Sequence, residues 1–390
     1  MSSSNKMSSP VKLLASEASI ARFRRGLLGW YRAAKRDLPW RRTRDPYRIW
    51  LSEIMLQQTR VAAVLDYYRR FLARFPTVEA LAAARLEEVL RLWAGLGYYS
   101  RARNLHRAAQ EIVARHGGEF PRAWEAALAM PGVGKYTAAA ILSIAYDAPH
   151  AVLDGNVARV LARLDAVRGD LRAPRRWSAL ATRAQQLADP ASPGDWNQAM
   201  MELGAVVCLP SPPRCEQCPV RRFCSAHALG LENSLPAARR KRAPESVTLA
   251  AAVLLDPRGQ TLLVRPAEAD SALFSRMWQF PAVALKAGAT RASAIAALAT
   301  HLRRSLGIRS IKPAHLAPAD DSRHTVTFRR IRLATFLLRV KKLPRVSNSR
   351  TPLLARVAHL AVSSATKKIA AAALRTVPAV SAHRPRTTRP

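Results

Sequence analysis

One acidic side chain lies in surroundings that suit acid–base chemistry. Glu53 stands within the apolar stretch "WLSEIML". Partial desolvation raises the pKa of a carboxyl group, so this side chain would be useful as an acid near neutral pH. Gln57 follows at i+4 on the same helical face with Gln58 beside it, which places two amides next to the acid. A solvent-facing glutamate on an amphipathic helix remains the alternative.

A second carboxylate stands at the start of another predicted helix. Asp154 precedes Gly155 in "VLDGNVARVLARL", where the apolar residues recur at helical spacing. An aspartate at this place is a candidate for chemistry. It is equally suited to cap the helix, and its position alone does not distinguish the two roles.

All four cysteines of the chain form one compact group of potential metal ligands. Their spacing differs from the paired C-x2-C knuckles of a zinc ribbon and suits an iron–sulfur cluster better. In a reducing compartment such clustering favours metal ligation over disulfides. We therefore predict a [4Fe-4S] cluster of structural role, with zinc and unliganded thiols as alternatives, at Cys208, Cys215, Cys218 and Cys224.

Two further motifs suit binding to a polyanion. In "MPGVGKYT", Gly132 and Gly134 allow a sharp turn that directs backbone amides and the next helix, beginning near Lys135, at a phosphate. This pattern indicates a helix–hairpin–helix clamp, with an ordinary helix–helix turn as the alternative. "LWAGLGYYSRARNLH" suits a loop that wedges Tyr98 into a base stack, or a helix junction with Tyr98 or Tyr99 in the core.

The charge of the chain indicates an extended anionic partner. Sixty-three Lys and Arg residues against 26 Asp and Glu residues give a net charge of +37, and nucleic acid is the foremost candidate. No run of about 18 apolar residues occurs, and the N-terminal "MSSSNKMSSPVKLL" lacks a hydrophobic signal core. We expect a cytoplasmic, nucleoid-associated protein that is a monomer and does not bind membranes.

The elements that must position these residues follow from apolar periodicity and breakers. After a polar segment at 1–19, residues 20–232 show helical spacing and predict an all-α domain. Residues 233–246 are basic and contain Pro and Ser, as expected of a linker. Residues 247–345 predict an α+β domain, and residues 346–390 a basic, disordered tail that either is solvated or binds phosphates.

Together these motifs resemble the adenine DNA glycosylase family, within the helix–hairpin–helix, endonuclease III-like superfamily. The resemblance is strong over about 20–230 and weak over 247–340. It rests on order and spacing of "LPW", "WLSEIMLQQT", "WAGLGYYSRARNLH", "MPGVGKYTAAAI", "LDGNVARVLAR", "NQAMMELGA" and the cysteine loop. It implies an all-α helix–hairpin–helix glycosylase domain with an iron–sulfur cluster loop, followed by an α+β Nudix-like domain.

The resemblance also implies roles for individual residues. The general acid of the family matches Glu53, the essential aspartate Asp154 and the active-site tyrosine Tyr136. The residues that wedge into the duplex match Gln58 and Tyr98. Less firmly matched are the residues that line the adenine pocket, which are Trp40, Arg41 and Glu202.

The implied reaction is hydrolysis of the N-glycosidic bond of adenine mispaired with 8-oxoguanine or guanine in double-stranded DNA. The target nucleotide must first leave the base stack. Bifunctional relatives carry a Schiff-base lysine where this chain has Tyr136, and Lys135 is one residue too early. Ala158 also replaces a lysine that some members carry, so the resemblance predicts a monofunctional glycosylase with little lyase activity.

The Nudix-like region departs from its relatives in ways that bear on function. Residues 281–308 contain no Asp or Glu to hold Mg²⁺, so this module should bind and not hydrolyse. "MWQFP" matches the domain signature, but Ala282 replaces the usual glycine. In "HTVTFRR", Thr327 offers the hydroxyl expected to contact 8-oxoguanine, while Phe328 stands where a histidine is usual. The preference for 8-oxoguanine over guanine is therefore left open.

Three other readings of the sequence compete with this one. An endonuclease III-type pyrimidine glycosylase is disfavoured by Glu53, Tyr136 and the second domain. A noncatalytic DNA-binding protein would show strongly salt-dependent affinity for any duplex and release no adenine. A redox sensor built on the cluster would change its DNA binding when the cluster is reduced.

Overall fold

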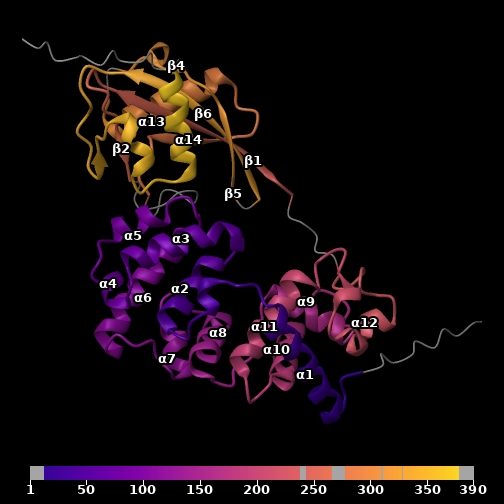
Figure 1. The fold of residues 1–390 in the computed structure, drawn as a ribbon. Coiled ribbons are helices and arrows are strands. Elements are labelled where there is room, and N and C mark those ends of the chain that lie inside the picture. Colours follow the sequence, from indigo (N-terminus) through magenta and orange to yellow (C-terminus); the bar gives the residue numbers. More distant parts are fainter. Residues whose placement is uncertain (1–12, 238–242, 266–276, 309–310, 327, 377–390) are drawn as a thin grey trace, which may run out of the picture. The chain divides into compact units, whose positions relative to one another are not determined.

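The computed structural model describes residues 13–237, 243–265, 277–308, 311–326 and 328–376 (Figure 1). Thr327, the predicted 8-oxoguanine contact, lies outside these residues. Within them, no helix is long and apolar enough to cross a membrane.

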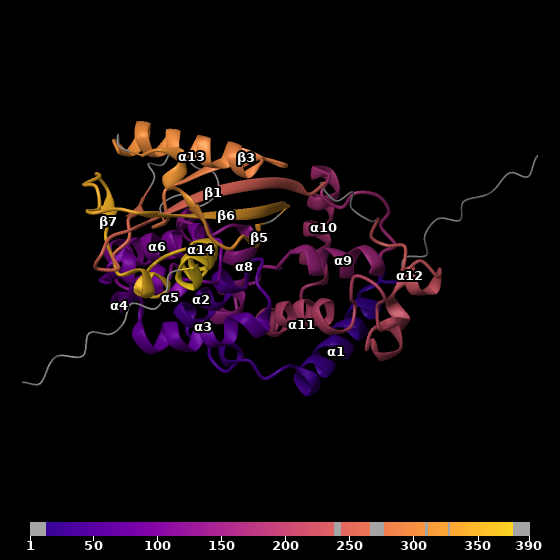
Figure 2. The same cartoon turned by 90° about the horizontal axis from the view of Figure 1, so that it is seen from above.

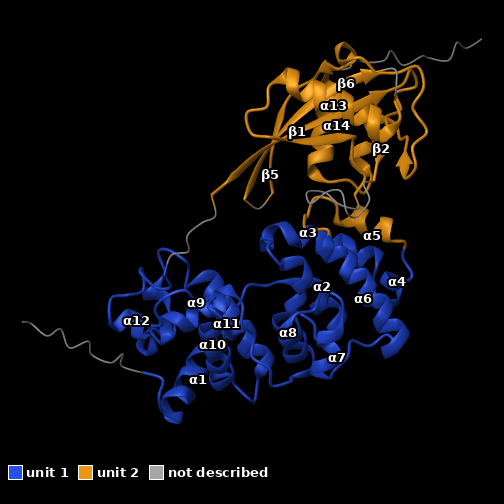
Figure 3. Ribbon diagram, turned by 180° about the vertical axis from the view of Figure 1, so that it is seen from behind, with its two compact units in different colours: residues 1–84, 100–240 blue, residues 85–99, 241–390 orange. Residues whose placement is uncertain are grey.

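The chain divides into two compact units (Figure 3). The first comprises residues 1–84 and 100–240. The second comprises residues 85–99 and 241–390. Residues 85–99, predicted as part of the helical domain, therefore group with the C-terminal unit.

The described part of the first unit is built from helices, which confirms the all-α prediction. Helices recur from one end of the unit to the other, joined by short turns and three short 3-10 helices. They are α1 (Glu17–Ala34), η1 (Pro39–Arg41), α2 (Pro46–Leu56), α3 (Val61–Arg74), α4 (Val78–Ala82), α6 (Ser100–His116), α7 (Trp124–Ala129), α8 (Lys135–Tyr146), α9 (Gly155–Leu164), α10 (Pro174–Leu187), α11 (Pro193–Val206), η2 (Cys215–Gln217), η3 (Arg221–Phe223) and α12 (Ser225–Ala228).

Capping side chains explain where several of these helices begin. Ser16 forms a capping box with Ser19 at the start of α1. Asp45 accepts from the backbone N–H groups of α2, whose first residue is Pro46. Thr77 caps α4 in the same way. Of these three helices, α2 carries part of the candidate site, and the Asp45 cap fixes where it begins.

Two glycines of α11 bring neighbouring helices close to it. A Cβ on Gly194 would lie 2.7 Å from the carbonyl oxygen of Ser143 in α8. A Cβ on Gly204 would lie 2.9 Å from the Cβ of Asn156 in α9. Because no other residue fits such close approaches, these glycines let α8 and the start of α9 pack against α11.

The second unit is an α+β structure, as predicted. Its main sheet has the order β3-β1-β6-β4, with β5 also paired to β6; β1 and β6 are parallel and the other pairs antiparallel. A smaller sheet pairs β2 with β7. The elements are α5 (Leu86–Trp93), β1 (Glu245–Leu255), β2 (Leu263–Val264), β3 (Ala282–Lys286), α13 (Arg291–Leu306), η4 (Pro313–His315), β4 (Ala317–Pro318), β5 (Ser322–Val326), β6 (Arg329–Arg339), β7 (Ser349–Arg350), η5 (Leu354–His359) and α14 (Ser364–Thr376).

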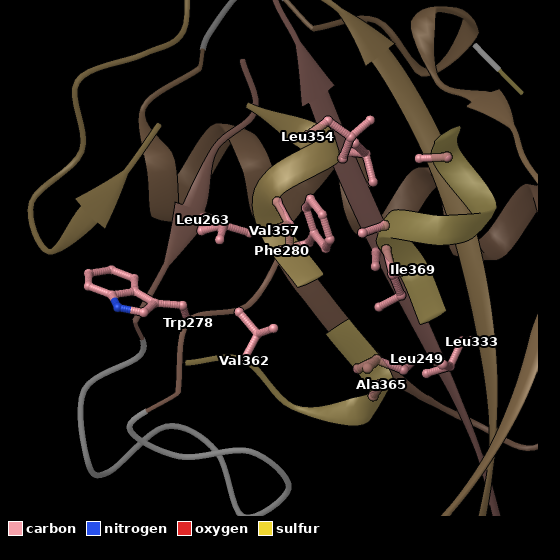
Figure 4. Packing of buried hydrophobic residues seen from close by; sticks show 14 of the residues in the cluster. Leu249, Leu263, Trp278, Phe280, Leu333, Leu354, Val357, Val362, Ala365 and Ile369 are labelled. Atoms are coloured by element: carbon pink, nitrogen blue, oxygen red, sulfur yellow. The ribbon is translucent and has the colours of Figure 1, made fainter. Parts of the chain in front are cut away.

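A helix covers each face of the main sheet (Figure 2). Alternate residues of β1 point to opposite faces, as the period of two in a strand requires. Leu249 and Val253 belong to one core with Ile369 of α14. Figure 4 shows Leu249 and Ile369 in this core. Ala252 belongs to the other core with Leu298 of α13. This mixed sheet between helices is consistent with the predicted Nudix-like domain.

The prediction of a disordered tail over 346–390 is wrong for its first part. Residues 349–376 form β7, η5 and α14. Val357, Val362 and Ile369 are buried in the same core as β1. The basic composition concealed an apolar helical face, because the lysines and arginines occupy the other side. Residues 377–390 lie outside the described part of the chain.

Candidate active site

A cavity of about 210 Å³ in the first unit brings together most of the residues predicted to do chemistry. It is bordered by η1, α2, α8, α11 and the start of α9. The lining includes polar and apolar side chains, among them Arg36, Leu38, Trp40, Arg41, Ser52, Glu53, Tyr136, Asp154, Asn156, Gln198, Met201 and Glu202. Helices far apart in the sequence thus converge on one pocket.

Glu53 is the buried acid of this cavity. The residue is 6% exposed, and it lies on α2 where the neighbouring side chains form the core. Burial raises the pKa of its carboxyl to about 7, against a lowering effect of the hydrogen bond from Tyr136. The negative charge of Asp154 raises that pKa further, and Arg41 lowers it. Glu53 can therefore exchange a proton near neutral pH.

Tyr136 holds this carboxylate. Its hydroxyl donates to Oε2 of Glu53 at 2.9 Å and also lies 3.0 Å from Sδ of Met201. Burial raises the pKa of Tyr136 well above its ordinary value, and the charges of Glu53 and Asp154 raise it further. The phenol thus keeps its proton and remains a donor.

Asp154 caps α9 and also lines the cavity. Its Oδ1 caps α9 by accepting from the backbone N–H groups of Asn156 at 2.9 Å and Val157 at 2.7 Å. Its Oδ2 accepts from Nδ2 of Asn156 at 3.2 Å. The capping bonds fix the carboxylate in place while the side chain also lines the cavity. They hold the carboxylate at the wall of the cavity.

Glu202 also lines the cavity and accepts hydrogen bonds from two arginines. Arg36 donates to both carboxylate oxygens at 2.7 and 2.6 Å, and Arg41 donates to Oε2 at 2.7 Å. Burial alone would raise the pKa of Glu202, but the two guanidinium hydrogen bonds bring it down to about 2. Glu202 is therefore a permanent anion that positions Arg41 in the cavity. Sequence reasoning missed Arg36, since nothing local links it to Glu202.

Trp40 supplies an aromatic wall. It lies in η1, is 7% exposed and packs edge-on against Tyr68 with ring centroids 5.3 Å apart. Pro39 opens η1 and fixes the turn that directs the ring to the cavity. A flat apolar surface beside hydrogen-bonding groups suits a planar heterocycle.

The other predicted contacts lie outside this cavity. Gln57 is the C-cap residue that follows α2, and its Nε2 donates to Oγ1 of Thr137 at 3.3 Å. Gln58 has a φ of 56°, a conformation uncommon for a non-glycine residue and often found at functional positions. Tyr98, which belongs to the second unit, has a φ of 47° and is 41% exposed. An exposed aromatic side chain on strained backbone fits a wedge.

The predicted hairpin is present before α8. Gly132 has a φ of 80°, and the backbone N–H of Val133 donates to the carbonyl of Met130 at 3.0 Å. Gly134 caps α8 without a side-chain hydrogen bond, and Lys135 is exposed at the first turn. Within the described residues no side chain caps this helix end, which suits the binding of an anion.

The four cysteines lie between α11 and α12 as partly buried free thiols. In the described part of the chain no three His, Cys, Asp or Glu side chains are arranged to hold a metal ion. Burial raises the pKa of Cys218 to about 12 and of Cys224 to about 11, and the other cysteines add to both shifts. The buried guanidinium of Arg163 donates to Sγ of Cys208 at 3.2 Å, as would suit a thiolate.

Comparisons with known proteins identify relatives of this chain. Residues 51–183 match the model of the HhH-GPD superfamily of base excision DNA repair proteins. The adenine DNA glycosylase of Rattus norvegicus is 51% identical over 56% of this chain and 44% of its own length. That of Mus musculus is 40% identical over 71% of this chain and 64% of its own. The chain thus spans less than two thirds of either relative.

A solved structure supports the same family assignment. A thermostable thymine-DNA glycosylase is 31% identical and superposes with a TM-score of 0.50. The match covers 54% of this chain and 97% of that structure. Because nearly all of that enzyme is represented here, the likeness extends over its complete fold. The chain belongs to the HhH-GPD superfamily of base excision DNA repair proteins.

Proposed function

We propose that this protein is a monofunctional adenine DNA glycosylase acting on adenine mispaired with 8-oxoguanine or guanine. The names of the rat and mouse relatives support the choice of adenine. The single observation that carries the chemistry is the hydrogen bond between Tyr136 and Glu53 in a cavity that Asp154 also lines.

The arrangement supports a two-carboxylate mechanism on an extruded nucleotide. Protonated Glu53 donates its proton to N7 of adenine, which makes the base a better leaving group. As the glycosidic bond breaks, positive charge develops on the sugar, and Asp154 stabilises it electrostatically or as an adduct. Glu53, now a carboxylate, takes a proton from the attacking water. Tyr136 keeps Glu53 oriented throughout.

A Schiff-base route lacks a suitable amine in the cavity. Tyr136 occupies the position where bifunctional relatives carry lysine. Lys135 is exposed and is not among the residues that line the cavity. These facts support base release without efficient strand cleavage.

We propose double-stranded DNA as the partner and the hairpin at Gly132 and Gly134 as one of its phosphate contacts. The free amides before α8 and the net charge of +37 support this. We assign reading of the base opposite adenine to the second unit, whose Nudix-like module should bind without hydrolysis. A cytoplasmic, nucleoid-associated location fits the DNA partner.

We also propose a [4Fe-4S] cluster. Its ligands would be the four partly buried cysteines between α11 and α12, namely Cys208, Cys215, Cys218 and Cys224. Arg163 would offset the negative charge of the cysteine ligands, since its guanidinium already contacts Cys208. When bound, the cluster would brace the basic loop that carries Arg221 and Arg222.

One assay tests the activity. Incubation with a duplex carrying 8-oxoguanine opposite adenine should release free adenine, and strand breaks should appear only after alkali. Glu53→Gln should abolish release while keeping mismatch binding, and Glu111→Gln, which changes a glutamate outside the cavity, should leave release unchanged. Activity in Glu53→Gln, or binding without any adenine release by the wild type, would contradict the proposal.

A further inference from the structure

The hydroxyl of Tyr136 lies within reach of two acceptors that come from different helices. Oε2 of Glu53 on α2 is 2.9 Å away, and Sδ of Met201 on α11 is 3.0 Å away. Among the residues that the structure describes, these two are the partners of this hydroxyl. A phenol carries a single proton, so it donates fully to one of them at a time. The proposed function uses the bond to Glu53 and gives Met201 no role.

The strength of Glu53 as an acceptor depends on its own protonation. As a carboxylate it accepts a charge-assisted hydrogen bond, which is stronger than a bond between neutral groups. Protonation removes the charge, and the carboxyl group then has a proton of its own to donate. The thioether of Met201 is a weak acceptor in both cases. The phenol proton of Tyr136 therefore favours Glu53 when that residue is ionised, and Met201 becomes its alternative when Glu53 is neutral.

A thioether is well suited to this second position. It accepts a hydrogen bond and never donates one. A hydroxyl or amide at residue 201 would also offer a proton to the carboxylate of Glu53 and so favour its ionised form. The methylene and methyl groups of methionine also keep this part of the cavity wall apolar. Met201 thus serves the phenol without competing for the acid.

Two adjacent methionines of α11 face different surroundings. Met201 lines the cavity. Met200 is 2% exposed in the core and is not among the residues that line the cavity. Successive residues of a helix are separated by about 100° around its axis, which explains the difference. Met200 therefore provides a matched control for substitution of Met201.

We propose that Met201 is a positioning residue that holds the phenol proton of Tyr136 while Glu53 is protonated. Once Glu53 has given its proton to the departing base, the hydroxyl turns back to Oε2 of the carboxylate. The covalent O–H bond of Tyr136 stays intact, and only its hydrogen-bond partner changes. Met201 thereby stabilises the acid form of Glu53, whereas the bond from Tyr136 stabilises the ionised form. This inference rests on the role that the proposed function gives to Glu53.

Other charged and titratable groups also surround this acid. Asp154 raises the pKa of Glu53 and Arg41 lowers it. The groups that neighbouring elements direct toward α2 or the cavity are Tyr136, Asp154, Arg41, Arg36, Glu202, Arg101 and Tyr68. Met201 carries no charge, so Met201→Leu leaves all of them in place and removes only the sulfur.

The pH dependence of single-turnover adenine release tests this with the full-length protein. Met201→Leu keeps an apolar side chain of similar volume but removes the acceptor that serves the protonated state. The pKa of Glu53 should therefore fall, and the descending limb should move to lower pH by about 0.5, as expected for one weak hydrogen bond. Met200→Leu should leave the limb in place. A limb of Met201→Leu that stays in place or moves to higher pH would overturn the proposal.

The same substitution in a Tyr136→Phe background separates this role from an effect of packing. Water that entered a loosened cavity would also lower the pKa of Glu53, and it would do so with or without a hydroxyl at residue 136. The proposed role needs the phenol, so adding Met201→Leu to Tyr136→Phe should not move the limb further. An equal shift in both backgrounds would assign the effect to packing and contradict the proposal.

A measurement without substrate distinguishes failure of this inference from failure of the proposed function. ¹³C NMR of labelled glutamate gives the titration midpoint of the Glu53 carboxyl in the free protein, with the signal assigned by its loss in Glu53→Gln. We expect a lower midpoint in Met201→Leu than in the wild type. This result would support the role of Met201 even if no adenine were released. Equal midpoints would contradict that role even if adenine release were normal.

Discussion

The hydroxyl of Tyr136 donates a 2.9 Å hydrogen bond to Oε2 of Glu53, a residue 83 positions earlier in the chain. This bond opposes the burial that raises the pKa of Glu53 to about 7. Burial and the hydrogen bond thus act on the pKa of Glu53 in opposite directions. The resulting pKa suits a group that must both give and take a proton.

Removing this bond should shift the pH dependence of the reaction. Tyr136→Phe deletes the interaction that lowers the pKa of Glu53, so that pKa rises. Because Glu53 acts first in its protonated form, the descending limb of the single-turnover rate against pH should move to higher pH. A limb that moves to lower pH or stays in place would show that Tyr136 does not tune this acid.

The raised pKa of Glu53 should also make the stability of the protein depend on pH. Its folded pKa of about 7 exceeds the ordinary 4.5, so the folded state binds its proton more tightly, and that stabilisation is lost as pH rises from 4.5 to 7. Glu53→Gln carries no such loss. Its free energy of unfolding should therefore exceed that of the wild type at pH 8 by up to about 3 kcal/mol, and the difference should shrink toward pH 4.5. Urea titrations at several pH values measure this.

The stability contributed by Glu202 and its two arginines should show the opposite pH dependence. Its folded pKa of about 2 lies below the ordinary 4.5, so it contributes stability above pH 4.5 that is lost as pH falls toward 2. Glu202→Gln also leaves Arg36 and Arg41 without their anion. We expect it to lower the free energy of unfolding by about 2 kcal/mol at pH 7, less than for a fully buried pair because the Arg36 side chain is 38% exposed. Equal stability of the two proteins at pH 7 would contradict this.

The hairpin offers a pair of glycines with different requirements. Gly132→Ala must adopt a φ of 80° and bring its Cβ to 2.8 Å from the Cβ of Asn104, so it should cost about 1–3 kcal/mol and lower Tm. Gly134→Ala meets nothing within 4 Å at an ordinary φ of −98°, so its Tm should stay near that of the wild type. Duplex affinity at a fixed salt concentration should fall more for Gly132→Ala. Similar Tm values for both variants would show that the backbone at residue 132 does not require glycine.

Local sequence rules predicted the features that depend on neighbouring residues. The helical spacing of the first unit predicted its class, and the apolar surroundings of Glu53 predicted a desolvation that the structure shows. Asp154 was predicted as either a cap or a site residue, and its position satisfies both. Such features are encoded within one or two turns of the chain.

Features that depend on distant residues could not be predicted in this way. Arg36 and Glu202 lie 166 positions apart, and only the packing of α1 against α11 brings them together. The same reason explains the error over 349–376, because the apolar face of α14 has meaning only beside the sheet that it covers. The grouping of residues 85–99 with the C-terminal unit likewise depends on contacts such as the ion pair between Glu87 and Arg350.

The place of α14 on the sheet has a consequence for synthesis of the protein. The apolar core on the α14 side of the sheet includes Val253 and Leu333. It remains exposed until the ribosome has released residues up to about 376. A premature stop codon before Ser364 would therefore yield a chain with a large exposed apolar surface. Such a chain would be prone to aggregation and to degradation by cellular proteases. Nonsense mutations just before α14 should therefore be as damaging to this unit as earlier ones.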